Sequence, residues 1–253
     1  MTSLDSDDRG SHSRAWALVN AAARSYDALQ DMLRTARGAA ERIPGGHTGP
    51  TVDPADLKLW AQKWRWYERN SLPWNRARIH FELARRRSFC RWPVHGNVLE
   101  MLREGRLEVG EHVLLEPGVW LTAPAPGRIR IGAGSFLNLG VQVAAVELVE
   151  IGAHCMFANG CFVTDGNHRF DDPERPVTWQ GFSTKGPTRI GDNVWCGANV
   201  VVTSGVTIGE RCVIGANSVV TTDLPPYSIA AGAPAKVLRT IEYPGASVSP
   251  SRA

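Results

Sequence analysis

The sequence predicts a mainly β fold, a parallel β-helix of about five coils with an α-helical N-terminal extension. Apolar side chains recur at every sixth position without a gap along one stretch: Ile190, Cys196, Val202, Ile208, Ile214 and Val220. Shorter runs keep the same step between Val109 and Val163, and a glycine directly follows seven members of the runs. A step of six fits neither a helix, with about 3.6 residues per turn, nor a flat strand, with about 2. It fits a short strand followed by a tight corner, repeated many times.

Three such units close one triangular coil, and the runs supply enough units for five coils over residues 105–228. The apolar residue of each unit is expected to point inward, and the following glycine lets the backbone pass because it has no Cβ. Coils stack at about 4.8 Å, the usual spacing of paired strands. A single coil cannot bury its own faces, so the stack as a whole provides the core.

Composition limits the function classes. The net charge of +3 does not favour a nucleic-acid partner. The cysteines are odd in number and include no Cys-x-x-Cys pair, which indicates a reducing compartment and no disulfide framework or zinc site. No apolar run approaches the ~18 residues of a membrane span, and the chain starts with acidic rather than basic residues. We therefore expect a cytoplasmic protein without a resident metal.

The N-terminal part divides into three predicted regions. Residues 1–43 hold a disordered start and a helix, 44–55 form a Gly/Pro-rich linker, and 56–104 form a basic, tryptophan-rich helical region. Between 56 and 92 ten bases stand against three acids, together with five of the nine tryptophans. Three interpretations stay open: a helical cap on the β-helix, peripheral contact with anionic lipid at the inner face of the membrane, or contact with substrate.

The repeat breaks after Val163 and resumes at Ile190, which predicts an extruded loop over 169–189. His168 stands where the chain leaves the coil, and polar neighbours such as Asp165, Asn167 and Asp172 can fix the tautomer of its ring. A neutral imidazole in this position can take a proton from an attacking hydroxyl group. A loop histidine that only forms hydrogen bonds is the alternative.

Three stretches between Ile131 and Arg239 resemble the hexapeptide-repeat O-acetyltransferases, the family that includes maltose, galactoside and lipopolysaccharide acetyltransferases. The stretches are Thr164–His168 with the following Asp-Asp-Pro, Ile190–Asn199, and Asp223–Ile229 continued by Gly232–Arg239. The resemblance implies a left-handed coil, an exception to the usual crossover hand. It also implies a homotrimer with active sites between neighbouring chains, and acetyl-CoA or a related short acyl-CoA as donor.

The resemblance implies a role for each matching residue. His168 is the general base, and Asn138 binds the acceptor or the transition-state oxygen. Asp165, Asn167 and Trp195 lie on the substrate side. The residues expected along the pantetheine arm are Gly197, Ala198, Ser204, Gly215 and Ala216. Lys236 and Arg239, in the C-terminal segment 229–253, are expected to meet the nucleotide phosphates of CoA.

The expected function is direct acetyl transfer to a hydroxyl group of a sugar or of a cell-envelope glycan or glycolipid precursor. The arginine- and tryptophan-rich region replaces the N-terminal acceptor-binding segment of the maltose and galactoside enzymes, so the acceptor stays open. Alternatives are N-acyl transfer to a sugar nucleotide, a non-catalytic hexapeptide-repeat scaffold, and a γ-type carbonic anhydrase, which needs three histidines on zinc.

Overall fold

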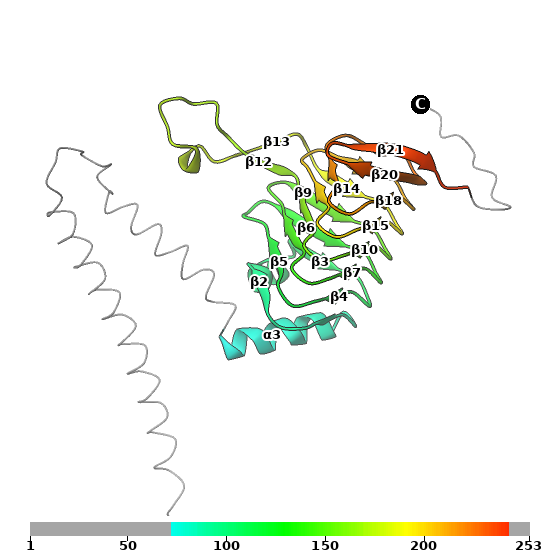
Figure 1. Ribbon diagram of the computed structural model, residues 1–253. Helices are drawn as coiled ribbons and strands as arrows, with labels where there is room; N and C mark the ends of the chain where they lie inside the picture. Colours follow the sequence, from blue (N-terminus) through cyan, green and yellow to red (C-terminus); the bar gives the residue numbers. More distant parts are fainter. Residues whose placement is uncertain (1–71, 243–253) are drawn as a thin grey trace, which may run out of the picture. The chain divides into compact units, whose positions relative to one another are not determined.

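The structure, a computed structural model, describes residues 72–242, which belong to the compact unit Pro54–Ala253. The predicted helix before residue 43, the linker at 44–55 and the tryptophan-rich stretch as far as residue 71 lie outside the described residues. The described part is a stack of short parallel strands with a helix at its N-terminal end and a strand hairpin at its C-terminal end (Figure 1).

Two helices close the N-terminal end of the stack. Helix α3 (Pro73–Ala84) starts with a proline, whose fixed φ suits the first helical position, and buries Ile79 and Leu83. Helix α4 (Val98–Arg103) buries four apolar side chains within six residues. The two helices pack against each other, and α3 also contacts the first strand. Among the described residues, no helix is both long and apolar enough to cross a membrane.

The strands form three parallel sheets, which are the three faces of a triangular prism. Sheet A contains β1 (Phe89–Cys90), β4 (Leu114–Leu115), β7 (Phe136–Leu137), β10 (Met156–Phe157), β15 (Trp195–Cys196), β18 (Val213–Ile214), β20 (Ser228–Gly232) and the antiparallel β21 (Ala235–Thr240). Sheet B contains β2 (Val94–Gly96), β5 (Val119–Thr122), β8 (Gln142–Ala144), β11 (Phe162–Thr164), β16 (Val201–Val202) and β19 (Val219–Val220). Sheet C contains β3 (Leu107–Val109), β6 (Arg128–Ile131), β9 (Leu148–Ile151), β14 (Thr188–Ile190) and β17 (Thr207–Ile208).

The repeat positions point inward, as predicted. Every one of them is buried, and the most exposed, Val109, retains 8% of its accessible surface. The strand register stacks each on its equivalent in the next coil, so that Leu137, Phe157, Cys196 and Ile214 form one column. The parallel β-helix is therefore confirmed, while its left hand stays a prediction.

The prism has six coils rather than the predicted five, because β1 and β2 form two sides of an additional coil at the N-terminal end. Helix α4 is inserted between β2 and β3, so the step of six is interrupted where this coil would have been recognised. The region 56–104, predicted to be helical, thus contains two strands between Phe89 and Gly96.

The glycines that follow inward residues are required by close approach rather than by an unusual φ. A Cβ at Gly132 would lie 2.5 Å from the backbone nitrogen of Ala153, and one at Gly191 would lie 2.7 Å from that of Glu210. In both cases the obstacle is the backbone of the next coil. The glycine therefore recurs because of the stacking: a side chain at this position would hold two neighbouring coils apart.

The buried thiols give the first testable prediction. All five cysteines are buried and unpaired, and burial raises the pKa values of Cys90 and Cys155 from 9.0 to about 11. The unfolded chain ionises these thiols at lower pH than the folded protein, so their contribution to stability is complete below pH 9 and is lost as the pH rises towards 11. We expect the free energy of unfolding in urea to fall over this range, with up to about 2 kcal/mol from Cys155.

A Cys155→Ala variant separates this effect from the titration of other groups. Its unfolding free energy should fall less steeply with pH than that of the wild type. Equal slopes for the two proteins would contradict the assignment.

Candidate active site

The predicted site residues lie at two different corners of the prism. Corner AB, where the chain passes from sheet A to sheet B, carries Asn138, Gly197, Ala198, Gly215 and Ala216. Corner BC, where the chain passes from sheet B to sheet C, carries Asp165 and Ser204, and the loop with His168 leaves the prism there. Within one chain, the strands of sheet B therefore separate His168 from Asn138.

His168 lies on a hairpin that projects from corner BC. Strand β12 (Gly166–His168) pairs antiparallel with β13 (Phe182–Thr184), and a short 3-10 helix, η2 (Val177–Trp179), lies in the loop between them (Figure 1). The imidazole is exposed and lies against Phe182, its partner in the hairpin register, with ring centroids 4.6 Å apart and planes inclined by 39°. Phe182 therefore restricts one side of the imidazole, a contact that the repeat pattern of the sequence does not indicate.

Asp165 anchors the first strand of this hairpin to the prism. Its side chain is fully buried, and its carboxylate accepts hydrogen bonds from the backbone N–H groups of Val146, Glu147 and Leu148 at 2.6, 2.7 and 2.6 Å. These donors belong to the preceding coil. The carboxylate thus faces the interior, so the geometry favours a structural role for Asp165 over the predicted contact with substrate.

Ser204 ties the two ends of the loop together. Its hydroxyl donates to the carbonyl oxygen of Asp165 and accepts from the backbone N–H of Lys185 at 2.9 Å. The hydroxyl of Thr188 adds a bond of 3.0 Å to the carbonyl oxygen of Thr164. Ser204 is buried at corner BC, away from the other predicted pantetheine contacts, and its role here is to fix the base of the hairpin.

At corner AB the stacking register produces a straight column. Asn138, Ala158, Gly197, Gly215 and Ala231 each follow the inward residue of a sheet A strand, and these strands pair directly. At about 4.8 Å per coil, the column rises by about 19 Å from Asn138 to Ala231. The side-chain oxygen of Asn138 accepts the N–H of Leu139 at 2.8 Å. This bond leaves the amide N–H donors of Asn138 directed elsewhere.

The glycines of this column serve the stack itself. A Cβ at Gly197 would lie 2.7 Å from the backbone nitrogen of Ala216, and one at Gly215 would lie 2.9 Å from the Cβ of Ala231. Their presence therefore does not require a ligand. The column is narrowest in side chains from Gly197 onward, where Ala198 and Ala216 are the next residues at the corner and both reach solvent, whereas Leu139 and Asn159 hold these positions in the two coils before it.

Two cations stand at the C-terminal end of the column. Strand β21 pairs with β20 and places Lys236 opposite Ala231 and Arg239 opposite Ile229. Both side chains are exposed. Lys236 thus lies next to the last residue of the corner AB column.

Trp195 lies on the outer face of sheet A, just before corner AB. Its side chain is 51% exposed and is aligned with Met156, which is 50% exposed, and with Val213. The same register continues along the whole sheet and defines the sheet A stripe: Phe89, Leu114, Phe136, Met156, Trp195, Val213 and Ile229. This face of the prism is apolar.

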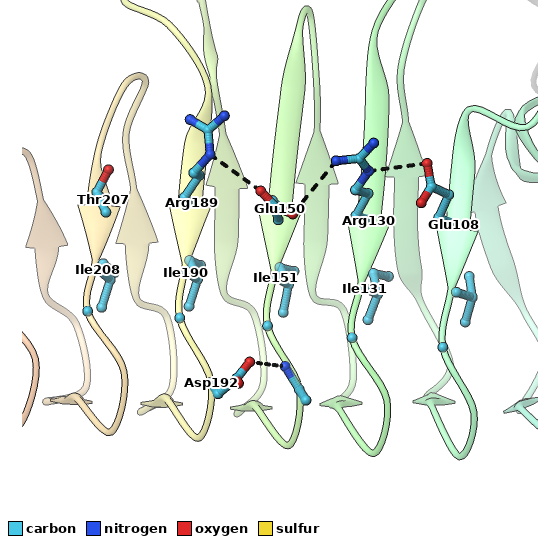
Figure 2. Close-up of a pocket in the computed structure, with 17 residues that line it drawn as sticks. Glu108, Arg130, Ile131, Glu150, Ile151, Arg189, Ile190, Asp192, Thr207 and Ile208 are labelled. Atoms are coloured by element: carbon cyan, nitrogen blue, oxygen red, sulfur yellow. Dashed lines mark hydrogen bonds and ion pairs between the residues drawn. The ribbon is translucent and has the colours of Figure 1, made fainter.

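The outer face of sheet C has the opposite character. A shallow groove of about 800 Å³ runs along it, and Figure 2 shows Glu108, Arg130, Glu150 and Arg189 side by side on successive strands. Arg130 lies 3.1 Å from Glu108 and 3.8 Å from Glu150, and Arg189 lies 3.3 Å from Glu150. The charges compensate one another, and the groove contains none of the predicted site residues.

The anchoring role of Asp165 gives the second prediction. In Asp165→Asn one of the carboxylate oxygens is replaced by a donor, so at least one buried backbone N–H loses its acceptor. We expect the free energy of unfolding to fall by about 2–4 kcal/mol, measured by urea denaturation. Asn167→Asp, a matched change at an exposed neighbouring position, should leave stability within about 0.5 kcal/mol of the wild type. Asp165→Asn with wild-type stability would contradict the anchoring role.

Comparisons with known proteins agree with this architecture. The family model "Bacterial transferase hexapeptide (six repeats)" matches residues 187–222. The galactoside O-acetyltransferase of Escherichia coli is 35% identical over 141 residues, which cover 56% of this chain and 67% of that protein. The probable acetyltransferase Rv3034c of Mycobacterium tuberculosis is 35% identical over 191 residues, or 72% of this chain and 63% of the relative.

The fold is shared with more distant enzymes. The crystal structure of AntD, an N-acyltransferase from Bacillus cereus, in complex with dTDP and 3-hydroxybutyryl-CoA, superposes with a TM-score of 0.52 at 17% identity, covering 73% of this chain and 88% of that one. This chain spans about three fifths to two thirds of the length of the curated relatives named above. On the identity and coverage of the galactoside enzyme, the chain belongs to the hexapeptide-repeat acetyltransferase family.

Proposed function

We propose that the protein is an acetyl-CoA-dependent O-acetyltransferase that acts on a hydroxyl group of a sugar or of a cell-envelope glycan or glycolipid precursor. The observation that carries this proposal is that one chain has both an exposed imidazole at corner BC and, at corner AB, a column of residues that ends next to Lys236. The first supplies a base and the second a track for an extended thioester. The relative from Escherichia coli, named as a galactoside O-acetyltransferase, supports a sugar hydroxyl as the acceptor.

We infer that each active site is built by two chains. His168 and Asn138 lie at different corners of one prism, so a single chain does not bring them together. In a closed trimer, corner BC of one chain faces corner AB of the next, and every chain contributes to two sites. The sheet A stripe and the apolar residues of the hairpin, Phe170 and Phe182, supply apolar surface for such contacts.

The donor fits the column in a definite direction. The thioester end lies near Asn138, and the pantetheine arm runs past Ala158 and Gly197 to Lys236, where the nucleotide phosphates meet fixed positive charge. The rise of about 19 Å suits an extended arm of this kind. Trp195 lies beside the middle of this track, at the level of Gly197 and two coils from Asn138.

Catalysis is direct transfer from sulfur to oxygen. The imidazole of His168 takes the proton of the acceptor hydroxyl as its oxygen attacks the thioester carbonyl. An amide N–H of Asn138 donates a hydrogen bond to the oxyanion that develops. The C–S bond then breaks, and the imidazolium returns its proton to the thiolate. An acyl-enzyme on cysteine has no support, because all five thiols are buried and burial raises their pKa values.

The third prediction concerns His168. We expect His168→Ala to lower the rate of CoA release by about 10²–10⁴-fold, because the hydroxyl loses its base, while CoA binding and the oligomeric state stay unchanged. Turnover is measured with acetyl-CoA and a panel of sugars, amino sugars and glycolipids. His95→Ala, at another exposed histidine, is the matched control and should retain full activity.

The acceptor panel also distinguishes acyl transfer to oxygen from acyl transfer to nitrogen. Release with hydroxyl-bearing acceptors supports the proposal, whereas release with amino sugars alone would establish an N-acyltransferase. An unchanged rate for His168→Ala would refute the assignment of the base. Failure to release CoA with any acceptor, together with a lack of CoA binding, would favour a non-catalytic scaffold.

The fourth prediction tests the shared site. His168→Ala and Asn138→Ala chains are each expected to be nearly inactive alone. When the two are unfolded together in equal amounts and refolded, about a quarter of the interfaces in a closed trimer pair an intact His168 with an intact Asn138. We therefore expect roughly a quarter of the wild-type activity to return. No recovery, with mixed trimers demonstrated by mass spectrometry, would mean that both residues serve the same site from one chain.

A further inference from the structure

Helix α3 presents an aromatic and basic face to solvent. Trp74 and Phe81 are 60% and 62% exposed, although α3 buries Ile79 and Leu83 on its other side. Arg78 and Arg85 are also exposed. The four outward residues follow one another at steps of four, three and four, so they share one face of the helix, which we call the α3 face.

The charge around this face is strongly positive. Between residues 72 and 92 six arginines stand against one glutamate, and that glutamate, Glu82, is already paired with Arg86 at 2.8 Å and Arg85 at 3.5 Å. The guanidinium of Arg85 also lies 6.0 Å from the ring of Phe81. The sequence directly before α3 is also rich in basic and aromatic residues, with four bases and three tryptophans between residues 56 and 71.

The position of α3 makes the face accessible to a flat surface. Figure 1 shows the helix across the N-terminal end of the coil stack, opposite the β20–β21 hairpin. In the proposed trimer a rotation about the symmetry axis carries each α3 face to the same height. Three copies at one end would then bind a surface together, which raises the apparent affinity well above that of one.

We propose that the α3 face docks the protein on an anionic lipid bilayer. Aromatic rings placed between arginines match the boundary between acyl chains and headgroups, where the rings enter the apolar layer and the guanidinium groups reach lipid phosphates. A soluble polyanion would satisfy the arginines but would leave Trp74 and Phe81 in water. The inference is independent of the acyl transfer, although it would place a glycolipid acceptor close to the enzyme.

The experiment is sedimentation of the full-length protein with vesicles, in the absence of acyl donor and acceptor. We expect binding to vesicles of mixed phosphatidylglycerol and phosphatidylcholine and little binding to phosphatidylcholine alone. Arg78→Glu/Arg85→Glu should weaken binding at least about tenfold, because each basic residue near an anionic surface contributes about a factor of five. Trp74→Ser/Phe81→Ser should also weaken it, most clearly at high salt, where the apolar contribution remains.

Arg128→Glu/Arg211→Glu is the matched control, since it makes the same change in net charge at two exposed arginines of the coils. This variant should bind like the wild type. The proposal is overturned if the wild type does not bind anionic vesicles, or if the control loses as much affinity as the α3 variants. It is also overturned if binding depends on the arginines alone and is matched by a lipid-free polyanion such as heparin.

Discussion

The rest of the structure depends on the close stacking of one coil on the next. Backbone N–H groups of the strands, such as those of Phe136 and Trp195, donate to carbonyl oxygens of the neighbouring coil. The inward side chains form columns such as Leu137, Phe157, Cys196 and Ile214. This spacing leaves no room for a Cβ at positions such as Gly132 and Gly191, where the next backbone passes. Because all coils must keep the same spacing, an insertion is accommodated only by leaving the prism at a corner. The hairpin with His168 is such an insertion, and α4 is another.

The stacking of the coils also separates His168 at corner BC from Asn138 at corner AB. A corner residue repeats vertically from coil to coil, so Asn138 can be aligned with Gly197 and Gly215 but not with a residue of corner BC. A general base carried by the corner BC hairpin therefore needs a second prism to face the corner AB column. The geometry of a triangular stack is therefore the reason for proposing a site shared between chains. The anchoring of the hairpin by Asp165 and Ser204 fits the proposed shared site, because a side chain that projects beyond its own prism keeps its position only if the base of its hairpin is fixed.

The sequence was informative wherever function followed the period of six. It predicted the inward residues and the place where the chain leaves the coil near His168, whereas the small residues of corner AB were expected only from the resemblance to a family. It missed the first coil because α4 interrupts the period between β2 and β3. It placed Asp165 with the substrate residues because Asp165 is close to His168 in sequence. Burial of its carboxylate against three backbone N–H groups depends on the preceding coil, which the local sequence does not specify. Phe182 was missed because its contact with His168 depends on the register of a hairpin, which no repeat specifies.

The residues that point outward differ between the sheets, so the same repeat gives a charged face on sheet C and an apolar face on sheet A. Glu108, Arg130, Glu150 and Arg189 each precede an inward residue, and the alternation of sign means that no strand of sheet C places like charges side by side (Figure 2). Exposed ion pairs of this kind contribute only about 0–1 kcal/mol each, so their main effect is to keep this face solvated. The equivalent positions of sheet A hold Phe136, Met156 and Trp195, whose exposure to water is unfavourable. A prism with one charged face and one apolar face has unlike surfaces for association, and this asymmetry is compatible with the proposed contact between corner BC of one chain and corner AB of another.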